Sequence, residues 1–471
     1  NTRLVVSMDS IAEFRVSSSL YSAESGSALG GQVHLVSKSG SNAFHGGVFE
    51  YFRNSALDAR TVFDGPELPP FRLNQFGGNL GGPIKRNKAF FFANFEGLRQ
   101  RQSSTFTNQV PSAALRSSVL AASPELRGVI EAYPVGDRPT GDPNVDDIVR
   151  QFSRKGTENS GMVRVDYNLS DRTTMFGRYN TNDALLSDPA GIRDIYQNEE
   201  AARTHNAVLQ VQRTFGPSTV NETRLGLNRN PRVERDTGIF LESFSIPGLT
   251  ELPTTESQSE IGTTFSLINN LSLFRGRHNL KFGGEVRRIH VNTGWTPSID
   301  VDFATIQDFI GNRVDEIDID EGLPMAGGRR TYYFGYAQDE IKVRHNMTLN
   351  LGVRYEYYTV LREVNDRLLV FDTGIGEFAA IGTPAYLPDR NNFAPRVSLA
   401  WAPGFLKEKT VIRAGYGMYY GPGQVDDVMA GIESTEQSFS LTAADLPGLS
   451  YPIAPFIGAA QSEGRTPRHL L

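Results

Sequence analysis

The residues that could carry chemistry are scattered along this chain, and none of them forms a catalytic motif. The seven histidines show no H-E-x-x-H spacing and there is no cysteine, so the usual zinc ligand sets are missing from the sequence. No G-x-S-x-G sequence marks a nucleophilic serine. Asp142, Asn144 and Asp146 resemble the first ligands of an EF-hand loop, but Asp147 and Ser153 stand where Gly and Glu are needed. The sequence predicts neither an enzyme nor a cofactor.

One acidic run falls in a predicted loop, over residues 315–321. Asp315, Asp318 and Asp320 offer carboxylate oxygens, which divalent cations prefer, and a cation bound here could bridge lipopolysaccharide. A solvated loop explains the same composition. These three aspartates are therefore kept only as weak metal candidates, and no defined metal site is predicted.

The remaining candidates are charged side chains within stretches of alternating polarity. Over residues 347–358, Leu351 and Val353 belong to one face of a strand, whereas Arg354 and Glu356 belong to the other. A strand of about ten residues tilted by about 45° rises roughly 23 Å, close to the apolar band of a transmembrane β-barrel. A soluble β-sandwich alternates in the same way, so this pattern alone leaves both folds open.

The lengths of the connections favour the barrel. Short links rich in turn-forming residues alternate with stretches longer than the roughly 12–15 residues usual in compact domains. The short links are residues 83–87, 170–172, 216–218, 275–277, 344–346 and 404–409, and the long connections are residues 54–70, 103–159, 181–204, 230–262, 292–328 and 361–392. Because outer-membrane barrels have short periplasmic turns and long extracellular loops, we predict an all-β, antiparallel transmembrane β-barrel with these two unlike rims.

The composition agrees with this fold without proving it. No apolar segment reaches about 18 residues, so the sequence predicts no transmembrane helix. Phe and Tyr make up most of the 10% aromatic residues, which suits the aromatic girdles of a barrel and also any β-rich core. With a net charge of -6 and dispersed Lys and Arg, the chain has no basic stripe for nucleic acid.

Several segments resemble a known family. Residues 11–16 (IAEFRV) and 32–40 (QVHLVSKSG) resemble the closing strands of the plug domain of TonB-dependent outer-membrane receptors. Residues 44–54 (FHGGVFEYFRN), 74–83 (NQFGGNLGGP), 88–96 (KAFFFANFE) and 336–340 (YAQDE) are similar to the Oar-like subgroup. The resemblance implies a barrel of 22 strands around a plug, of which about thirteen strands can be counted here.

The resemblance also divides the chain. It implies the C-terminal end of a plug at residues 1–42, barrel strands with long extracellular loops at 43–420, and a truncated extracellular loop at 421–471, with further sequence expected on both sides. Arginine at the bilayer midplane costs about 2–4 kcal/mol, so charged strand residues should face the lumen and the plug. These lumen-facing candidates are Glu285, Arg287, Arg354, Glu356 and Arg413, with Glu13 and Arg15 of the plug as natural partners.

The function implied by the resemblance is transport. A receptor of this family, in the outer membrane of a Gram-negative bacterium, takes up a scarce, bulky ligand such as a siderophore, glycan or peptide when the TonB-ExbB-ExbD complex pulls its plug. The expected partners are outer-membrane lipid and lipopolysaccharide, that complex through a missing N-terminal region, and an unidentified ligand, with no nucleic acid. An Oar-like surface adhesin or secretion-linked structural barrel shares the fold and is the alternative.

Overall fold

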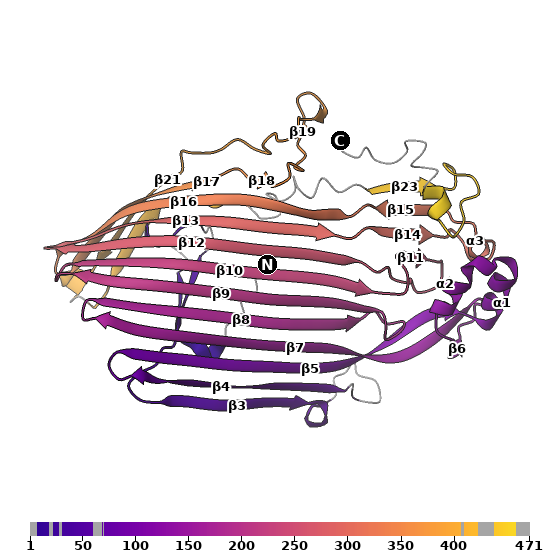
Figure 1. Ribbon diagram of the computed structural model, residues 1–471, viewed down its shortest axis with the longest axis horizontal. Helices are drawn as coiled ribbons and strands as arrows, with labels where there is room; N and C mark the ends of the chain where they lie inside the picture. Colours follow the sequence, from indigo (N-terminus) through magenta and orange to yellow (C-terminus); the bar gives the residue numbers. More distant parts are fainter. Residues whose placement is uncertain are drawn as a thin grey trace.

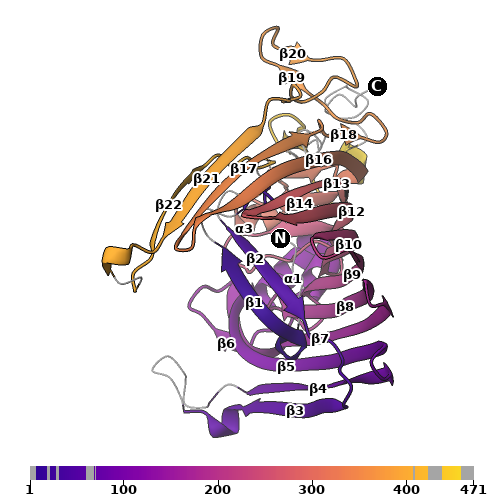
Figure 2. The ribbon, with the colours of Figure 1, turned by 90° about the vertical axis from the view of Figure 1, so that its left-hand side faces the viewer.

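A single curved sheet dominates the computed structural model, which describes residues 7–17, 22–27, 31–59, 68, 70–406, 409–422 and 438–457. Within these residues, thirteen strands follow one another in the order β22-β21-β17-β16-β13-β12-β10-β9-β8-β7-β5-β4-β3, and every neighbouring pair is antiparallel (Figure 1). Figure 2 shows this sheet curving around the small β1-β2 sheet. The predicted all-β, partial antiparallel barrel is confirmed.

We call this thirteen-stranded curved sheet the wall. Its strands differ widely in length. They are β3 (His45–Asn54), β4 (Phe71–Lys85), β5 (Ala89–Pro111), β7 (Val145–Ser170), β8 (Thr173–Pro189), β9 (Gln197–Phe215), β10 (Thr219–Thr237), β12 (Ser257–Arg275), β13 (His278–Trp295), β16 (Leu323–Arg344), β17 (Met347–Tyr358), β21 (Phe393–Trp401) and β22 (Ile412–Gly417). Two short strands, β6 (Arg138–Pro139) and β18 (Arg362–Glu363), pair with β7 and β16. They do so at the ends of β7 and β16 that lie farther from the tight turns.

One rim of the wall consists of tight links, and all six lie where the sequence predicts them. For example, β9 ends at Phe215 and β10 begins at Thr219, while β12 ends at Arg275 and β13 begins at His278. Gly216 and Gly276 have φ of +69° and +61° in these two turns, a conformation that glycine adopts without a steric penalty. Turn chemistry therefore fixes this rim.

At the opposite ends of the strands, the connections are shorter than the sequence predicts because the strands extend further. The sequence places long connections at residues 103–159 and 181–204, yet β5 extends to Pro111, β7 begins at Val145, and only seven residues separate β8 from β9. The 26 residues of β7 rise roughly 60 Å at a tilt of 45°, more than twice the apolar band. Above the lipid, strands keep their hydrogen-bonded ladder but need no apolar outer face, so alternation no longer marks them.

The two faces of the wall follow the predicted alternation. On β17, Leu351 and Val353 are 43% and 42% exposed on the convex face, whereas Arg354 and Glu356 are 3% and 0% exposed on the concave face. The convex face carries further exposed apolar side chains, including Leu225, and is the face that lipid covers. No helix among the described residues is long and apolar enough to cross a membrane.

A compact cap lies beyond the long-connection rim. We define the cap as residues 112–144, 190–196, 238–256, 296–322 and 438–457. Its elements are α1 (Ala113–Ala122), η3 (Pro124–Leu126), α2 (Arg127–Ala132), β11 (Glu242–Ser245), β14 (Ser298–Asp302), α3 (Ile306–Ile310), β15 (Glu316–Asp320) and β23 (Ser438–Thr442), and Figure 1 shows most of them gathered at one end of the wall. The strands form one sheet in the order β11-β14-β15-β23.

The cap has its own hydrophobic core. Leu115 and Val119, one turn apart on α1, are fully buried, as are Phe244 of β11, Val301 of β14 and Ile317 of β15. The α1 helix is capped by Ser112, whose hydroxyl accepts a hydrogen bond from the Leu115 N–H. The connections therefore fold together as one unit, although the sequence predicts them as separate loops.

The remaining described elements are short. They are η1 (Met8–Ser10), β1 (Ile11–Ser17), β2 (Gln32–Ser37), η2 (Ser55–Leu57), the hairpin strands β19 (Phe371–Asp372) and β20 (Glu377–Phe378), and η4 (Gly404–Leu406).

The orientation of the two rims gives a direct test. Because the chain has no cysteine, a single introduced cysteine reports its own exposure. We expect Ser117→Cys on the exposed side of α1 to react with a membrane-impermeant maleimide on intact cells, and Asp171→Cys in a tight turn to react only after lysis. Labelling of the turn from outside would show that the orientation is reversed.

Candidate functional site: the contact between residues 22–27 and the wall

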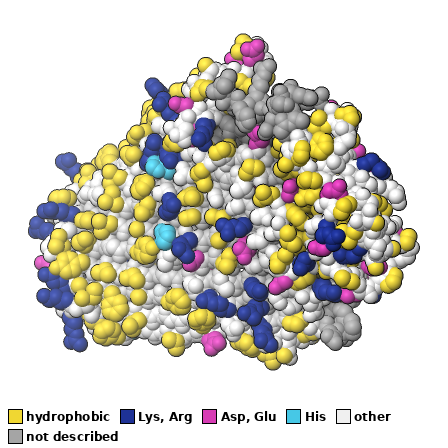
Figure 3. All heavy atoms as spheres, turned by 45° about the vertical axis from the view of Figure 1, so that its right-hand side comes forward, with side chains coloured by type: hydrophobic (Ala, Val, Ile, Leu, Met, Phe, Trp, Pro, Cys, Tyr) yellow, Lys and Arg dark blue, Asp and Glu magenta, His cyan; other side chains and the backbone are white. Residues whose placement is uncertain are grey.

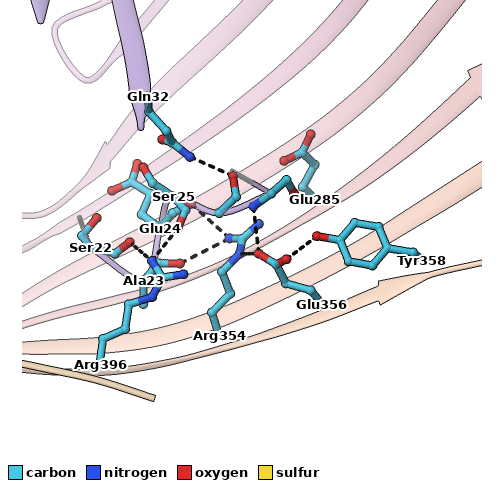
Figure 4. Close-up of polar contacts among 12 residues, drawn as sticks. Ser22, Ala23, Glu24, Ser25, Gln32, Glu285, Arg354, Glu356, Tyr358 and Arg396 are labelled. Atoms are coloured by element: carbon cyan, nitrogen blue, oxygen red, sulfur yellow. Dashed lines mark hydrogen bonds and ion pairs between the residues drawn. The ribbon is translucent and has the colours of Figure 1, made fainter. Parts of the chain in front are cut away.

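The described segment between β1 and β2, residues 22–27, lies against the concave face of the wall. Its partners come from four wall strands, β13, β16, β17 and β21. Figure 4 shows Arg354, Glu356 and Arg396 directed toward the segment. Ala23 is 1% exposed and Gly26 packs so closely that a Cβ atom there would lie 2.1 Å from Arg354 Nε. A small and flexible sequence is therefore required where the segment meets the wall.

The centre of this site is a buried ion pair on β17. Arg354 Nε lies 2.5 Å from Glu356 Oε1, and both side chains are almost completely buried. The Arg354 guanidinium also stands 4.7 Å from the centre of the Phe334 ring. Tyr358 donates its hydroxyl to the other carboxylate oxygen, Glu356 Oε2. Burial of two charges is costly unless they are paired and fully hydrogen-bonded, which this arrangement achieves.

The pair extends to the backbone of the segment. Arg354 Nη1 donates to the carbonyl oxygens of Ala23 and Glu24 at 3.2 and 3.1 Å. The Ser27 N–H donates to Glu356 Oε1 at 3.1 Å. Each member of the ion pair therefore holds the segment as well as its partner.

Three residues from other wall strands add further polar contacts. Arg396 of β21 donates to the carbonyl oxygens of Ser22 and Ser25, both at 2.5 Å. Gln338 of β16 accepts from the Ala23 N–H at 2.8 Å. The third contact joins the Lys281 ammonium of β13 to the Glu24 carboxylate at 3.1 Å. Most of these bonds use main-chain groups of the segment, so its conformation matters more than its side chains.

Two more contacts hold the N-terminal elements to the other side of the wall. The Ser7 hydroxyl donates to Glu96 Oε2 of β5 at 2.5 Å. Arg164 of β7 donates to the Ser37 hydroxyl and carbonyl oxygens at 2.9 and 3.1 Å, and it pairs with Asp166 at 2.7 Å. The N-terminal elements thus cross the concave side, with polar contacts to β5 and β7 as well as to β13, β16, β17 and β21.

The structure brings only some of the predicted residues into this site. Arg354 and Glu356 form its centre, whereas Glu285 and Arg287 pair with each other at 2.7 Å on the same face. Arg413 lies opposite Ala400 on the edge strand β22, shares the lumen-facing side by register, and is exposed.

The prediction for the two plug residues needs correction. Glu13 and Arg15 are exposed on β1, and neither forms an ion pair with a described wall residue. They lie opposite Val36 and His34 of β2, so the β1-β2 pairing sets their direction. Arg354, Glu356 and Arg396 instead bind main-chain groups of residues 22–27, which no charge pattern reveals, and among the described wall residues only Lys281 pairs with a charged side chain there, that of Glu24. One sequence signal could have identified Arg396 as lumen-facing. Its neighbour Val397 is exposed on the convex face, so alternation places Arg396 on the concave face.

The weak metal candidates belong to the cap. Asp318 and Asp320 lie on β15, opposite Asp300 and Ser298 of β14, and Asp315 precedes the strand. No group of three or more His, Asp or Glu among the described residues has an arrangement that could hold a metal ion. The apolar side of the same strands faces the cap core, so the acidic side forms the polar face of a two-sided sheet.

This acidic face makes the stability of the cap depend on pH. Burial, followed by repulsion from Asp300 and Asp302, raises the pKa of Glu251 above its ordinary 4.5. Burial raises the pKa of Asp302 above 3.8, and Asp318 adds to that effect. A carboxyl group whose folded pKa is raised favours the folded state in its protonated form. The free energy of cap unfolding therefore falls as pH rises from about 4 through these raised values.

Hydrogen exchange can measure this dependence. After correction for intrinsic exchange, the amides of β14 and β15 are expected to be better protected at pH 5 than at pH 7. The Glu251→Gln variant, which removes one titrating group, should show a smaller difference. Better protection at pH 7 in the unmodified protein would contradict the assignment.

The curved antiparallel wall with an apolar convex face and a charged concave face defines an outer-membrane β-barrel. The chain belongs to the family described as "Outer membrane beta barrel domain", whose model matches residues 36–145 and 121–467. It is similar to the "TonB-dependent transporter Oar" of Myxococcus xanthus, with 35% identity over 98 residues, which are 19% of this chain and 9% of that protein.

Two solved structures share the fold. The outer membrane transporter YddB from Escherichia coli has 14% identity and a TM-score of 0.61, with 91% of this chain and 50% of YddB covered. The ferripyoverdine receptor of the outer membrane of Pseudomonas aeruginosa, bound to ferripyoverdine, has 12% identity and a TM-score of 0.50, with 85% and 45% covered. The chain thus spans about half the length of these proteins. The comparisons confirm the resemblance to TonB-dependent receptors and to Oar, and they locate the protein in the outer membrane of a Gram-negative bacterium.

Proposed function

We propose that this protein imports a bulky, scarce ligand through a plugged barrel, powered by the TonB-ExbB-ExbD complex. In this proposal residues 1–42 are the end of the plug, residues 43–420 form the wall and its connections, and residues 421–471 belong to an extracellular loop. The observation that carries the proposal is the polar contact of residues 22–27 with Arg354, Glu356 and Arg396.

The chemistry of this contact suits a plug that must move and return. Apolar packing would expose hydrocarbon each time the plug shifted, at about 25 cal/mol per Å². Hydrogen bonds to main-chain carbonyl groups can be exchanged for bonds to lumen water, so the net cost of each is about 1.5–3 kcal/mol when a charge is involved. A pull on the plug can therefore release residues 22–27 without unfolding the wall.

The ligand would enter from the cap side and pass along the charged concave face. The relatives are named as transporters and receptors, which supports binding and passage without catalysis. The receptor from Pseudomonas aeruginosa holds ferripyoverdine, and a siderophore, a glycan or a peptide is the kind of ligand we propose here.

The proposal is tested by the accessibility of the plug segment. An Ala23→Cys variant places a thiol at a position that is buried when the segment is docked. In energised cells, maleimide labelling from the periplasm should rise severalfold, and the rise should vanish with a protonophore or without the TonB complex. Ser117→Cys in the cap, labelled from outside the cells, should label equally in every condition.

A structural role is the second candidate, because the cap forms a folded surface unit with its own core. An Oar-like adhesin or a secretion-linked barrel would use this surface and would keep its plug segment docked. Labelling of Ala23→Cys that does not respond to energy would therefore refute the uptake proposal and favour the structural role.

A further inference from the structure

A row of basic side chains crosses the convex face of the wall. Strand pairing places Arg229 of β10 opposite Thr263 of β12, Thr263 opposite His290 of β13, and His290 opposite Arg329 of β16. Arg288 lies two residues below His290 on the same face. Four basic side chains from three strands therefore occupy one patch of the outer surface.

The patch is directed away from the lumen. Arg288 lies opposite Phe265, and Arg229 lies two residues beyond Leu227 on a strand whose Leu225 is exposed. Phe265 and Leu225 are 46% and 50% exposed on the face that lipid covers. Figure 3 shows hydrophobic side chains spread over much of the wall with Lys, Arg and His side chains among them.

The height of the patch is set by the strand lengths. Arg229 lies ten residues beyond Thr219, the first residue of β10 after its tight turn. Ten residues at a tilt of about 45° rise roughly 23 Å, which is the height of the apolar band of such barrels. The patch thus lies at the border between hydrocarbon and headgroups in the leaflet nearer the cap.

No ion pair within the described part of the chain involves the arginines of the patch. Arg229 donates to the Thr263 hydroxyl at 3.0 Å, Arg288 to the Thr331 hydroxyl at 2.8 Å, and Arg329 to the Asn292 amide oxygen at 2.9 Å. All three acceptors are neutral, and none of the ion pairs between described residues includes these arginines.

One carboxylate that attracts Arg329, that of Glu363, is already hydrogen-bonded to main-chain groups. Glu363 accepts hydrogen bonds from the N–H groups of Gly327, Asn365 and Arg367. Arg203 on the same convex face differs from the patch, because it pairs with Asp183 at 2.8 Å. Arginines without an ion-pair partner beside hydrocarbon are therefore available to an anion from elsewhere.

We propose that this patch, formed by Arg229, Arg288, His290 and Arg329, binds the phosphate groups of lipopolysaccharide in the outer leaflet. Guanidinium groups form bidentate hydrogen bonds with phosphate, and three of them within the four consecutive strands β10, β12, β13 and β16 match a headgroup with more than one phosphate. The acyl chains would then lie over the apolar surface around Leu225 and Phe265. This inference goes beyond uptake and holds whether or not the barrel transports a ligand.

The test uses the full-length protein purified in detergent and native mass spectrometry of bound lipid. The probes are lipid A with two phosphates, lipid A without phosphates, and phosphatidylglycerol. We expect the doubly phosphorylated form to bind at least tenfold more tightly than the other two. The Arg229→Gln, Arg288→Gln and Arg329→Gln triple variant should bind it on the order of 100-fold more weakly.

Matched variants separate the patch from general charge. Arg203→Gln, which removes a paired arginine from the same face, should bind as the unmodified protein does, and replacing the three arginines with Lys should retain part of the affinity. Heat-modifiable gel mobility verifies folding, and single Gln variants replace the triple variant if it does not fold. Unchanged binding by folded Gln variants, or equal binding of dephosphorylated lipid A or phosphatidylglycerol, would overturn the proposal.

Discussion

Replacing Arg354 with Leu is expected to destabilise the wall by about 3–5 kcal/mol, because it leaves the fully buried Glu356 carboxylate without its cationic partner. Urea unfolding in lipid vesicles, followed by gel mobility, measures this loss. Arg287→Leu is the matched control. Its partner Glu285 keeps 14% exposure, so water can solvate the remaining charge and the loss should be smaller.

A double replacement separates wall stability from docking of the segment. Arg354→Met with Glu356→Met removes both buried charges and should regain most of the lost stability. The same variant still lacks the bonds to Ala23 and Ser27, so a thiol at position 23 should remain accessible to maleimide. If the double variant unfolds as readily as Arg354→Leu, the ion pair is not the cause of the destabilisation.

Replacing Leu351 with Arg is expected to impair membrane assembly by about 2–4 kcal/mol, since it places a charge in the lipid near the middle of a wall strand. Leu351 is 43% exposed on the convex face. The fraction of protein with folded gel mobility after insertion into vesicles measures the effect.

A residue on the opposite face of β17 provides the control for that change. Thr348 lies three residues before Leu351, so its side chain points to the concave face, opposite Ala400 of β21 and near the tight-turn rim. Thr348→Arg should assemble at close to the normal yield. Equal loss from the two variants would show that the inside and outside of this strand are assigned wrongly.

The membrane-spanning part of the wall could be predicted from the sequence because lipid and lumen water impose opposite demands on successive residues. The bounds of β17, residues 347 to 358, coincide with the predicted strand. The tight turns could also be predicted, since glycine and polar residues mark positions such as Gly216 and Gly276.

The part of the wall beyond the lipid and the cap could not be predicted from the sequence, and the reason is physical. Beyond the lipid, β5 and β7 continue as a ladder without a lipid-covered face, with Val110 and Ile148 packed in the cap core, and their sequences lose the apolar alternation that lipid imposes. The cap core joins short apolar segments such as those around Leu115 and Phe244, which are too far apart in the chain for any local pattern to connect.

The wall residues of the candidate site could be predicted from the sequence, whereas their partners could not. Alternation identified Arg354 and Glu356 as lumen-facing, and burial agrees with that placement. The partners were missed because they are peptide groups of Ala23, Glu24 and Ser27, and every residue type has such groups. A search for opposite charges led instead to Glu13 and Arg15, which the structure leaves exposed.

The shared core of the cap limits how the surface of this protein can be engineered or diversified. Ser123 of one connection donates to the Ile310 carbonyl of another, and Asn312 donates to the carbonyl of Tyr451. Replacing one of these connections with a foreign loop would remove apolar side chains from the shared core, and the other connections that pack in this core would lose their contacts. The hairpin of β19 and β20, whose Phe371 and Phe378 are exposed, is free of that constraint and is the place for an inserted epitope.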